Sequence, residues 1–280
     1  MTNLKVFIKK HPLLVYYCVV FVISWGCILV AFGPAGVLTK EAVYFIGPIS
    51  LAGPSIAGIL LTIIVNGKGG LRDLLSRLFR WRVGLRWYAV ALLTAPILYT
   101  AITLMLLQTS RDFLPDIVTS DSKTSILLSG ISAGIMVSIF EELGWTGFAT
   151  PQWRKRYGIL TTGLIMGLLW GLWHLPLFLG SALASQTVSP PIYLLVMLFS
   201  WLPPYRILMV WVYDHTRSLL LGILMHLPIV VAQFVRFSSA MSETQAVIDM
   251  LILAAALWIM VAAVQRQQTV TRQAHGTLPG

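Results

Sequence analysis

Charged side chains are scarce in this sequence: of its 280 residues, 11% are charged and 57% are hydrophobic. A soluble domain carries roughly 25% charged residues. The mean hydropathy is +0.82, and the apolar runs leave no room between them for a separate soluble domain. We therefore predict one integral membrane domain over residues 1–280, most of it within the bilayer.

Several common features are also missing. The only cysteines, Cys18 and Cys27, both lie in the first apolar run, where a disulfide within one helix is geometrically implausible. We expect them to be small buried residues. The chain has no convincing internal repeat and no His-Glu-x-x-His segment, which excludes the common zinc-protease helix.

The apolar runs are long enough to cross a membrane. A transmembrane helix needs about 20 residues to cross ~30 Å. Eight runs come close to or exceed this length: roughly 12–32, 43–65, 88–107, 125–148, 160–180, 190–212, 218–238 and 246–264. They are too long and too evenly apolar for β-barrel strands, the other way to span lipid. We predict an all-α polytopic membrane helix bundle with about eight transmembrane helices.

Acidic residues are half as frequent as basic ones, and the net charge is +10. The basic residues lie in short loops between apolar runs, so we expect no nucleic acid partner. If the N-terminus is inside, fifteen of the twenty Lys and Arg residues fall in inner segments. This asymmetry predicts a multi-pass protein of the cell membrane with cytoplasmic N- and C-termini, in contact with membrane lipids.

Two segments outside the spans have patterns of their own. Residues 66–87 place leucine and phenylalanine at helical spacing between arginines. This predicts a cytoplasmic amphipathic helix that either anchors the chain on anionic headgroups or gates the site. Residues 265–280 are polar, and we expect a flexible cytoplasmic tail.

Two adjacent carboxylates, Glu141 and Glu142, interrupt the fourth apolar run, with no basic residue nearer in sequence than Lys123 or Arg154. A charged group in the hydrocarbon region costs ~2.5–3.5 kcal/mol on insertion scales. The pair therefore needs partners from elsewhere. Adjacent helical residues differ by about 100° in direction, so the two carboxylates cannot do the same job.

The candidate partners are polar residues in later spans. His174 and His226 each begin a His-Leu-Pro tripeptide, and Arg206 follows Pro203-Pro204, where a broken helix is expected. Two imidazoles and a carboxylate make up many hydrolytic zinc sites, and they also suit acid–base catalysis without metal. The metal ligands would be His174, His226 and Glu141. Nearby aromatic residues, among them Trp145 and Trp170, would wall the site.

Three motifs in these segments resemble the CAAX protease and bacteriocin-processing (CPBP) family, also known by its abortive-infection label. The family has Glu-Glu-x-x-x-Arg, then Phe-x-x-x-His, then His-x-x-x-Asn. Here residues 141–146 read Glu-Glu-Leu-Gly-Trp-Thr, residues 170–174 read Trp-Gly-Leu-Trp-His, and residues 226–230 read His-Leu-Pro-Ile-Val. The resemblance covers a catalytic core of about residues 125–235.

The resemblance implies an intramembrane endopeptidase with a site open to the cytoplasm and a membrane-bound peptide or protein substrate. Glu141 would activate the water, and Glu142 would support it. His174 and His226 would bind a metal or stabilise the oxyanion and the leaving group. The family is often described as metalloproteases, but a metal-free glutamate mechanism has also been proposed, so both zinc and no cofactor stay open.

Three positions depart from the family pattern: Thr146 replaces the arginine, Trp170 the phenylalanine and Val230 the asparagine. Loss of one oxyanion donor typically costs ~10²–10³ in rate. We predict that Arg206 supplies the charge missing at Thr146. The alternatives are a non-catalytic immunity or scaffold membrane protein, and a proton-coupled transporter.

Overall fold

The computed structural model describes residues 3–32 and 40–276, with side chains at 3–31 and 46–267. Every regular element in these ranges is helical. Seven stretches are long and apolar enough to cross a membrane: Pro12–Ala31, Ile46–Leu78, Leu85–Leu106, Lys123–Arg154, Ile159–Ala184, Pro190–Thr216 and Glu243–Gln267. The predicted all-α membrane bundle is therefore confirmed, and the chain is a multi-pass membrane protein.

The spanning stretches correspond to elements in chain order. The long helices are α2 (Pro12–Phe32), α3 (Lys40–Leu78), α4 (Leu85–Leu106), α6 (Lys123–Gly144), α8 (Ile159–Ala184), α10 (Leu202–Thr216), α11 (Leu219–Val235) and α12 (Glu243–Gly276). The short elements are α1 (Asn3–Lys10), η1 (Arg111–Phe113), α5 (Asp116–Thr119), α7 (Thr150–Arg154) and α9 (Pro190–Leu195), with π-helical turns η2 (Trp145–Ala149) and η3 (Val196–Ser200).

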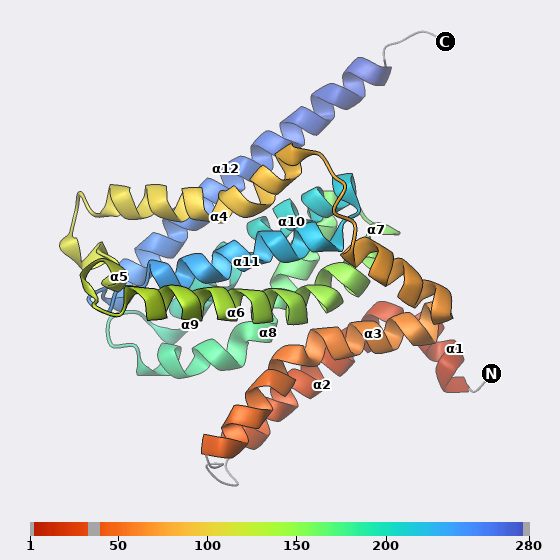
Figure 1. Cartoon of the computed structure of the whole chain (residues 1–280), viewed down its shortest axis with the longest axis horizontal. Coiled ribbons are helices and arrows are strands. Elements are labelled where there is room, and N and C mark those ends of the chain that lie inside the picture. Colours follow the sequence, from red (N-terminus) through yellow and green to blue (C-terminus); the bar gives the residue numbers. More distant parts are fainter. Residues whose placement is uncertain (1–2, 33–39, 277–280) are drawn as a thin grey trace.

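The run at 218–238 differs in length from the other spans. Its helix, α11, has 17 residues, at the short limit of roughly 17–25 residues for a crossing helix. In Figure 1, α11 lies beside α6, and α2 and α3 form a slanted pair at the side of the bundle. The α1 helix, the end of α3, α7 and the last turns of α12 lie toward the same end of the bundle.

Glycines bring the helices of the bundle close together. A Cβ atom at Gly163, Gly167 or Gly171 of α8 would collide with the backbone of α10 or η3. At the end of α6, a Cβ on Gly144 would collide with the Pro54 carbonyl of α3. Small residues at these positions permit tight packing where there is no hydrophobic driving force between helices.

The α3 helix changes direction at Gly67, which has φ 63° and ψ −155°. Residues after this break form the helix predicted within 66–87. Leu74 is buried against Leu219 and Ile223, whereas Leu75 and Phe79 are exposed. This helix therefore packs on the protein with one face and leaves apolar side chains on another.

The segment predicted as a flexible tail at 265–280 begins as helix, because α12 continues to Gly276. Its last turns contain four Gln and two Arg, which favour helix, and proline is absent before the end of the helix. Residues 277–280 lie outside the described range, and the flexibility of the tail stays a prediction.

Candidate active site

The adjacent carboxylates lie in the last turn of α6, where the helix widens into η2. Glu141 is 1% exposed and Glu142 is fully buried. π-Helical turns of this kind are frequent at functional sites. The Thr150 hydroxyl donates to the Trp145 carbonyl at 2.9 Å across the wide turn. As expected from their different directions, the two carboxylates have entirely different partners.

Glu142 is surrounded by donors. Arg206 Nη1 and Nη2 donate to its two oxygens at 2.9 and 3.0 Å, and the Thr146 hydroxyl donates to Oε2. His226 Nδ1 donates to Oε1 at 2.9 Å. The predicted ion pair between Arg206 and a motif carboxylate is therefore present, and it is bidentate. Because both oxygens of Glu142 already accept hydrogen bonds from protein groups, Glu142 is a poor candidate for the group that takes a proton in the reaction.

Glu141 is held on one oxygen only. The indole N–H groups of Trp170 and Trp145 donate to Oε2 at 2.7 and 3.3 Å. Within the described residues, no basic side chain lies within ion-pair distance of Glu141. Oε1 has no protein hydrogen bond there, and it is not among the fully enclosed polar atoms. Of the two adjacent carboxylates, only Glu141 therefore has an oxygen that accepts from no protein donor in the described ranges.

Trp170 connects the two carboxylates and both histidines. Its N–H holds Glu141, and the Arg206 guanidinium lies 4.2 Å from its ring centroid. The ring centroids of His226 and His174 lie 5.2 and 5.7 Å from it. The structure thus brings together Glu141, Glu142, His174, His226 and Arg206, which the sequence placed on four different spans.

His174 and His226 both carry a proton on Nδ1. His174 Nδ1 lies 2.9 Å from the Trp170 carbonyl oxygen, and His226 Nδ1 meets a carboxylate oxygen. Because both partners only accept, each Nδ1 carries the proton. The Nε2 atoms are then available for another proton, a hydrogen bond or a metal.

These residues do not fit a three-ligand metal site as they are placed. Within the described part of the chain, no three His, Cys, Asp or Glu side chains lie close enough to share an ion. Glu142 is saturated by protein donors, and Glu141 is turned onto two indoles.

The departures from the family pattern have distinct surroundings. Thr146 lies against Gly222 and donates to Glu142. Arg206 occupies the charge-pairing position from α10 instead of from the motif helix. Val230 lies one turn after His226 and packs on the apolar core. Trp170 contributes an N–H that phenylalanine lacks.

Sequence reasoning missed contacts from two other helices. Tyr17 of α2 stacks on Trp145 with ring centroids 5.8 Å apart, and Tyr16 meets it edge-on at 5.7 Å. The Tyr16 hydroxyl is buried and has no partner among the described residues. The sequence feature that could have indicated these contacts is the pair Tyr16-Tyr17 inside the first apolar run. Arg77, one of the arginines in the segment 66–87, is buried and donates to the Gly147 carbonyl.

Comparison with known proteins finds similarity over the segment that contains this site. Residues 123–232 match the family model described as Type II CAAX prenyl endopeptidase Rce1-like. The CAAX prenyl protease 2 of Methanococcus maripaludis is 29% identical over 94 residues, which cover 33% of this chain and 35% of that protein. The match thus spans about a third of that relative. The segment that carries the Glu-Glu and both histidine motifs is therefore similar to CAAX prenyl endopeptidases, which supports the resemblance to the CAAX protease and bacteriocin-processing family.

Proposed function

We propose that this protein is an intramembrane endopeptidase that hydrolyses a peptide bond of a membrane-bound peptide or protein. The observation that carries this proposal is the asymmetry of the two carboxylates. Glu142 is neutralised and fully hydrogen-bonded, whereas Glu141 keeps one oxygen free. A structural ion pair needs only a carboxylate that is fully hydrogen-bonded, as Glu142 is. A general base needs a carboxylate with a free oxygen, as Glu141 has.

In this mechanism Glu141 handles the proton of the reaction. Oε1 takes a proton from a water molecule as the water oxygen bonds to the carbonyl carbon, and the carbonyl electron pair moves onto oxygen. The proton then passes to the amide nitrogen as the C–N bond breaks. The products are a carboxylic acid and an amine. The two indole N–H donors fix the orientation of the carboxylate throughout.

His226 is the proposed oxyanion partner. The Glu142 carboxylate holds its Nδ1–H, as an orienting carboxylate holds imidazole in hydrolase triads. In its protonated form His226 can donate from Nε2 to the developing negative charge. This role would replace the donor that the family pattern places at Val230. The His174 ring also contacts the Trp170 ring edge-on, and His174 would support the leaving group.

We further propose that the site faces the cytoplasm and that both termini are cytoplasmic. Basic residues support this orientation because they gather in α1, in the second part of α3 and around α7, which lie toward one end of the bundle. The name of the relative suggests a prenylated substrate for that protein. For this chain we propose only the wider class of membrane-associated peptides.

The decisive test is Glu141→Gln in the purified full-length protein, assayed against a library of membrane-associated peptides. Glutamine still accepts from both indoles but cannot take the proton. We expect cleavage to fall by about 10³-fold, within the range for general acid–base catalysis, with an unchanged melting temperature. Asp121→Asn, an exposed loop change, serves as the control and should leave the rate unchanged.

A second candidate function is a non-catalytic scaffold or immunity protein, which Thr146 and Val230 favour because they remove two polar groups of the family pattern. Under this function the wild-type protein would cleave no peptide, and Glu141→Gln would leave its cellular activity intact. Cleavage by Glu141→Gln at the wild-type rate would reject Glu141 as the base.

A further inference from the structure

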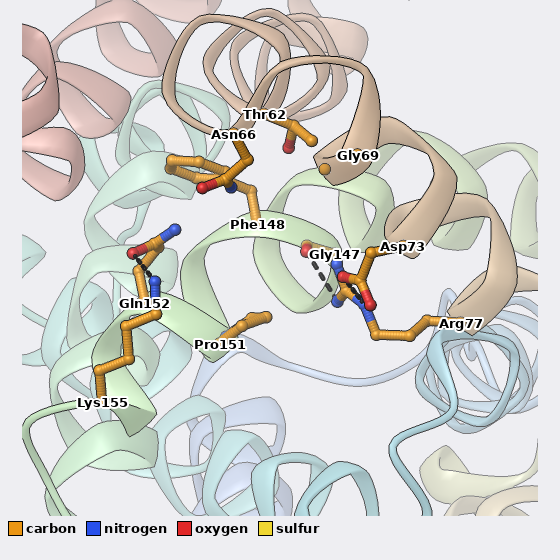
Figure 2. A pocket seen from close by; sticks show the side chains of 11 residues that line it. Thr62, Asn66, Gly69, Asp73, Arg77, Gly147, Phe148, Pro151, Gln152 and Lys155 are labelled. Atoms are coloured by element: carbon orange, nitrogen blue, oxygen red, sulfur yellow. Dashed lines mark hydrogen bonds and ion pairs between the residues drawn. The ribbon is translucent and has the colours of Figure 1, made fainter.

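A polar cavity lies outside the candidate active site, between the second part of α3 and the segment η2–α7. Its volume is about 340 Å³. Figure 2 shows Asn66, Asp73 and Arg77 on the α3 side, with Gln152 and Lys155 opposite. Aromatic packing of Tyr16 against Phe148 and Trp145 lies between this region and Glu141.

The break in α3 places the start of a helical segment at this cavity. Because Gly67 is non-helical, a new helical segment starts near Lys68, and the first N–H groups of a helical segment have no carbonyl partner within that segment. Gly69 lines the cavity, and a Cβ atom there would meet nothing within 4 Å. Such a helix start favours an anion, but it would not by itself make a site.

Buried Arg77 is the second observation. It is 8% exposed. Its Nε bonds to Asp73 at 2.8 Å, and its Nη1 donates to the Gly147 carbonyl and the Tyr213 hydroxyl at 2.9 and 3.0 Å. Nη2 has no protein partner in the described ranges and is not enclosed. The guanidinium is therefore rigidly held, with one donor nitrogen left over beside the cavity.

The charges around the cavity leave an excess of one cation. Asp73 offsets Arg77, whereas among the described residues Lys155 bonds only to the neutral Gln152 side chain, at 2.9 Å. A phosphodiester carries one negative charge and accepts several hydrogen bonds, so it matches this excess. The exposed apolar residues Leu75 and Phe79 on the same part of the chain suit contact with acyl chains.

We propose that this cavity binds the phosphodiester of a membrane phospholipid headgroup. The phosphate would lie between Lys155 and the free nitrogen of Arg77, near the N–H groups that follow Gly67. Because Arg77 also donates to Gly147 in η2, the bound lipid would brace the turn that follows the two carboxylates. The site is separate from peptide hydrolysis, so it stands or falls independently of the proposed function.

The test is native mass spectrometry of the detergent-purified full-length chain titrated with phosphatidylglycerol. Lys155→Met removes the unpaired cation, and Arg156→Met is the matched control, because it removes the same charge next door without lining the cavity. We expect Arg156→Met to bind like wild type and Lys155→Met to bind about tenfold more weakly, as for a charged hydrogen bond. Gly69→Leu should block the cavity and abolish tight binding.

Two results would overturn the proposal. Equal loss in Lys155→Met and Arg156→Met would show unspecific attraction between basic surface and lipid, and unchanged binding in both Lys155→Met and Gly69→Leu would exclude the cavity. In a parallel titration, inorganic phosphate at millimolar concentration should not displace the lipid. Displacement would instead assign the cavity to free phosphate.

Discussion

Two buried arginine–carboxylate pairs in this molecule look alike but differ in their neighbours. Arg206 pairs with Glu142 beneath Trp170, and Arg236 pairs with Asp249 close to the Tyr99 ring, with the guanidinium 4.2 and 4.6 Å from the ring centroids. In the first pair both carboxylate oxygens are used, and a histidine and a threonine join. In the second, Asp249 Oδ1 is buried and has no hydrogen-bond partner among the described residues.

A buried ion pair by itself therefore does not mark a site. Both pairs tie distant helix segments together, which is a structural task. Only the Arg206–Glu142 pair is connected, through His226 and Trp170, to side chains with unused acid–base atoms. The predictions that follow separate the structural task from the chemical one.

The largest contrast is expected between Arg206→Met and Arg236→Met. Each leaves a buried carboxylate unpaired, so each should lower the free energy of unfolding by about 3–5 kcal/mol. Thermal melting in detergent checks this. Peptide cleavage, measured well below both melting temperatures, should be lost only in Arg206→Met, because only that variant releases His226 from its orienting carboxylate.

Arg206→Lys separates the effect on stability from the effect on activity. Lysine keeps the charge but not the bidentate fork, so it should recover stability more than activity. Equal loss of cleavage in the Arg206 and Arg236 variants would show that both pairs act only through stability.

A smaller effect is expected from Trp170→Phe, which restores the family residue and removes one N–H donor to Glu141. We predict about a tenfold fall in kcat with KM nearly unchanged, because orientation of the base is lost and substrate contacts are not. Trp173→Phe is the matched control: the Trp173 N–H has no partner among the described residues, so its rate should not change. A fall in both variants would point to packing instead of the hydrogen bond.

The metal content of the purified protein tests whether Glu141, His174 and His226 hold a metal ion. We expect purified wild-type protein to contain far less than one zinc per chain by elemental analysis. About one zinc per chain, absent from His174→Ala/His226→Ala, would show that the histidines and Glu141 rearrange to bind it.

The smallest effect concerns the polar groups at the opposite end of the bundle, near Arg236. Hydrogen bonds from the Gln245 amide and the Ser110 hydroxyl lower the pKa of Asp112. Its contribution to stability is therefore present above the unfolded pKa of about 3.9 and is lost as the pH falls through the lower, folded value. Asp112→Asn should slightly flatten the fall in melting temperature between pH 5 and pH 3, while cleavage at pH 7 stays unchanged.

Much of the architecture and the identity of the site residues could be predicted from local sequence. Apolar run length predicted the spans, because each helix satisfies its own backbone hydrogen bonds in lipid. The cost of burying Glu141, Glu142 and Arg206 predicted that they need partners. The 100° separation of Glu141 and Glu142 on one helix predicted different surroundings for the two carboxylates, and the structure gives them different partners. That they have different roles stays a prediction.

Which partner each group has depends on contacts between helices that are far apart in the sequence. Whether Arg206 meets Glu141 or Glu142 depends on how α10 packs against α8, which the close approach at Gly163 and Gly167 permits and no local pattern specifies. The same holds for Trp170, whose N–H reaches Glu141, and for Arg77, whose neighbours form a cavity with Lys155. Local sequence thus fixes which ionisable groups are placed in the membrane, and long-range packing fixes which of their atoms keep no protein partner.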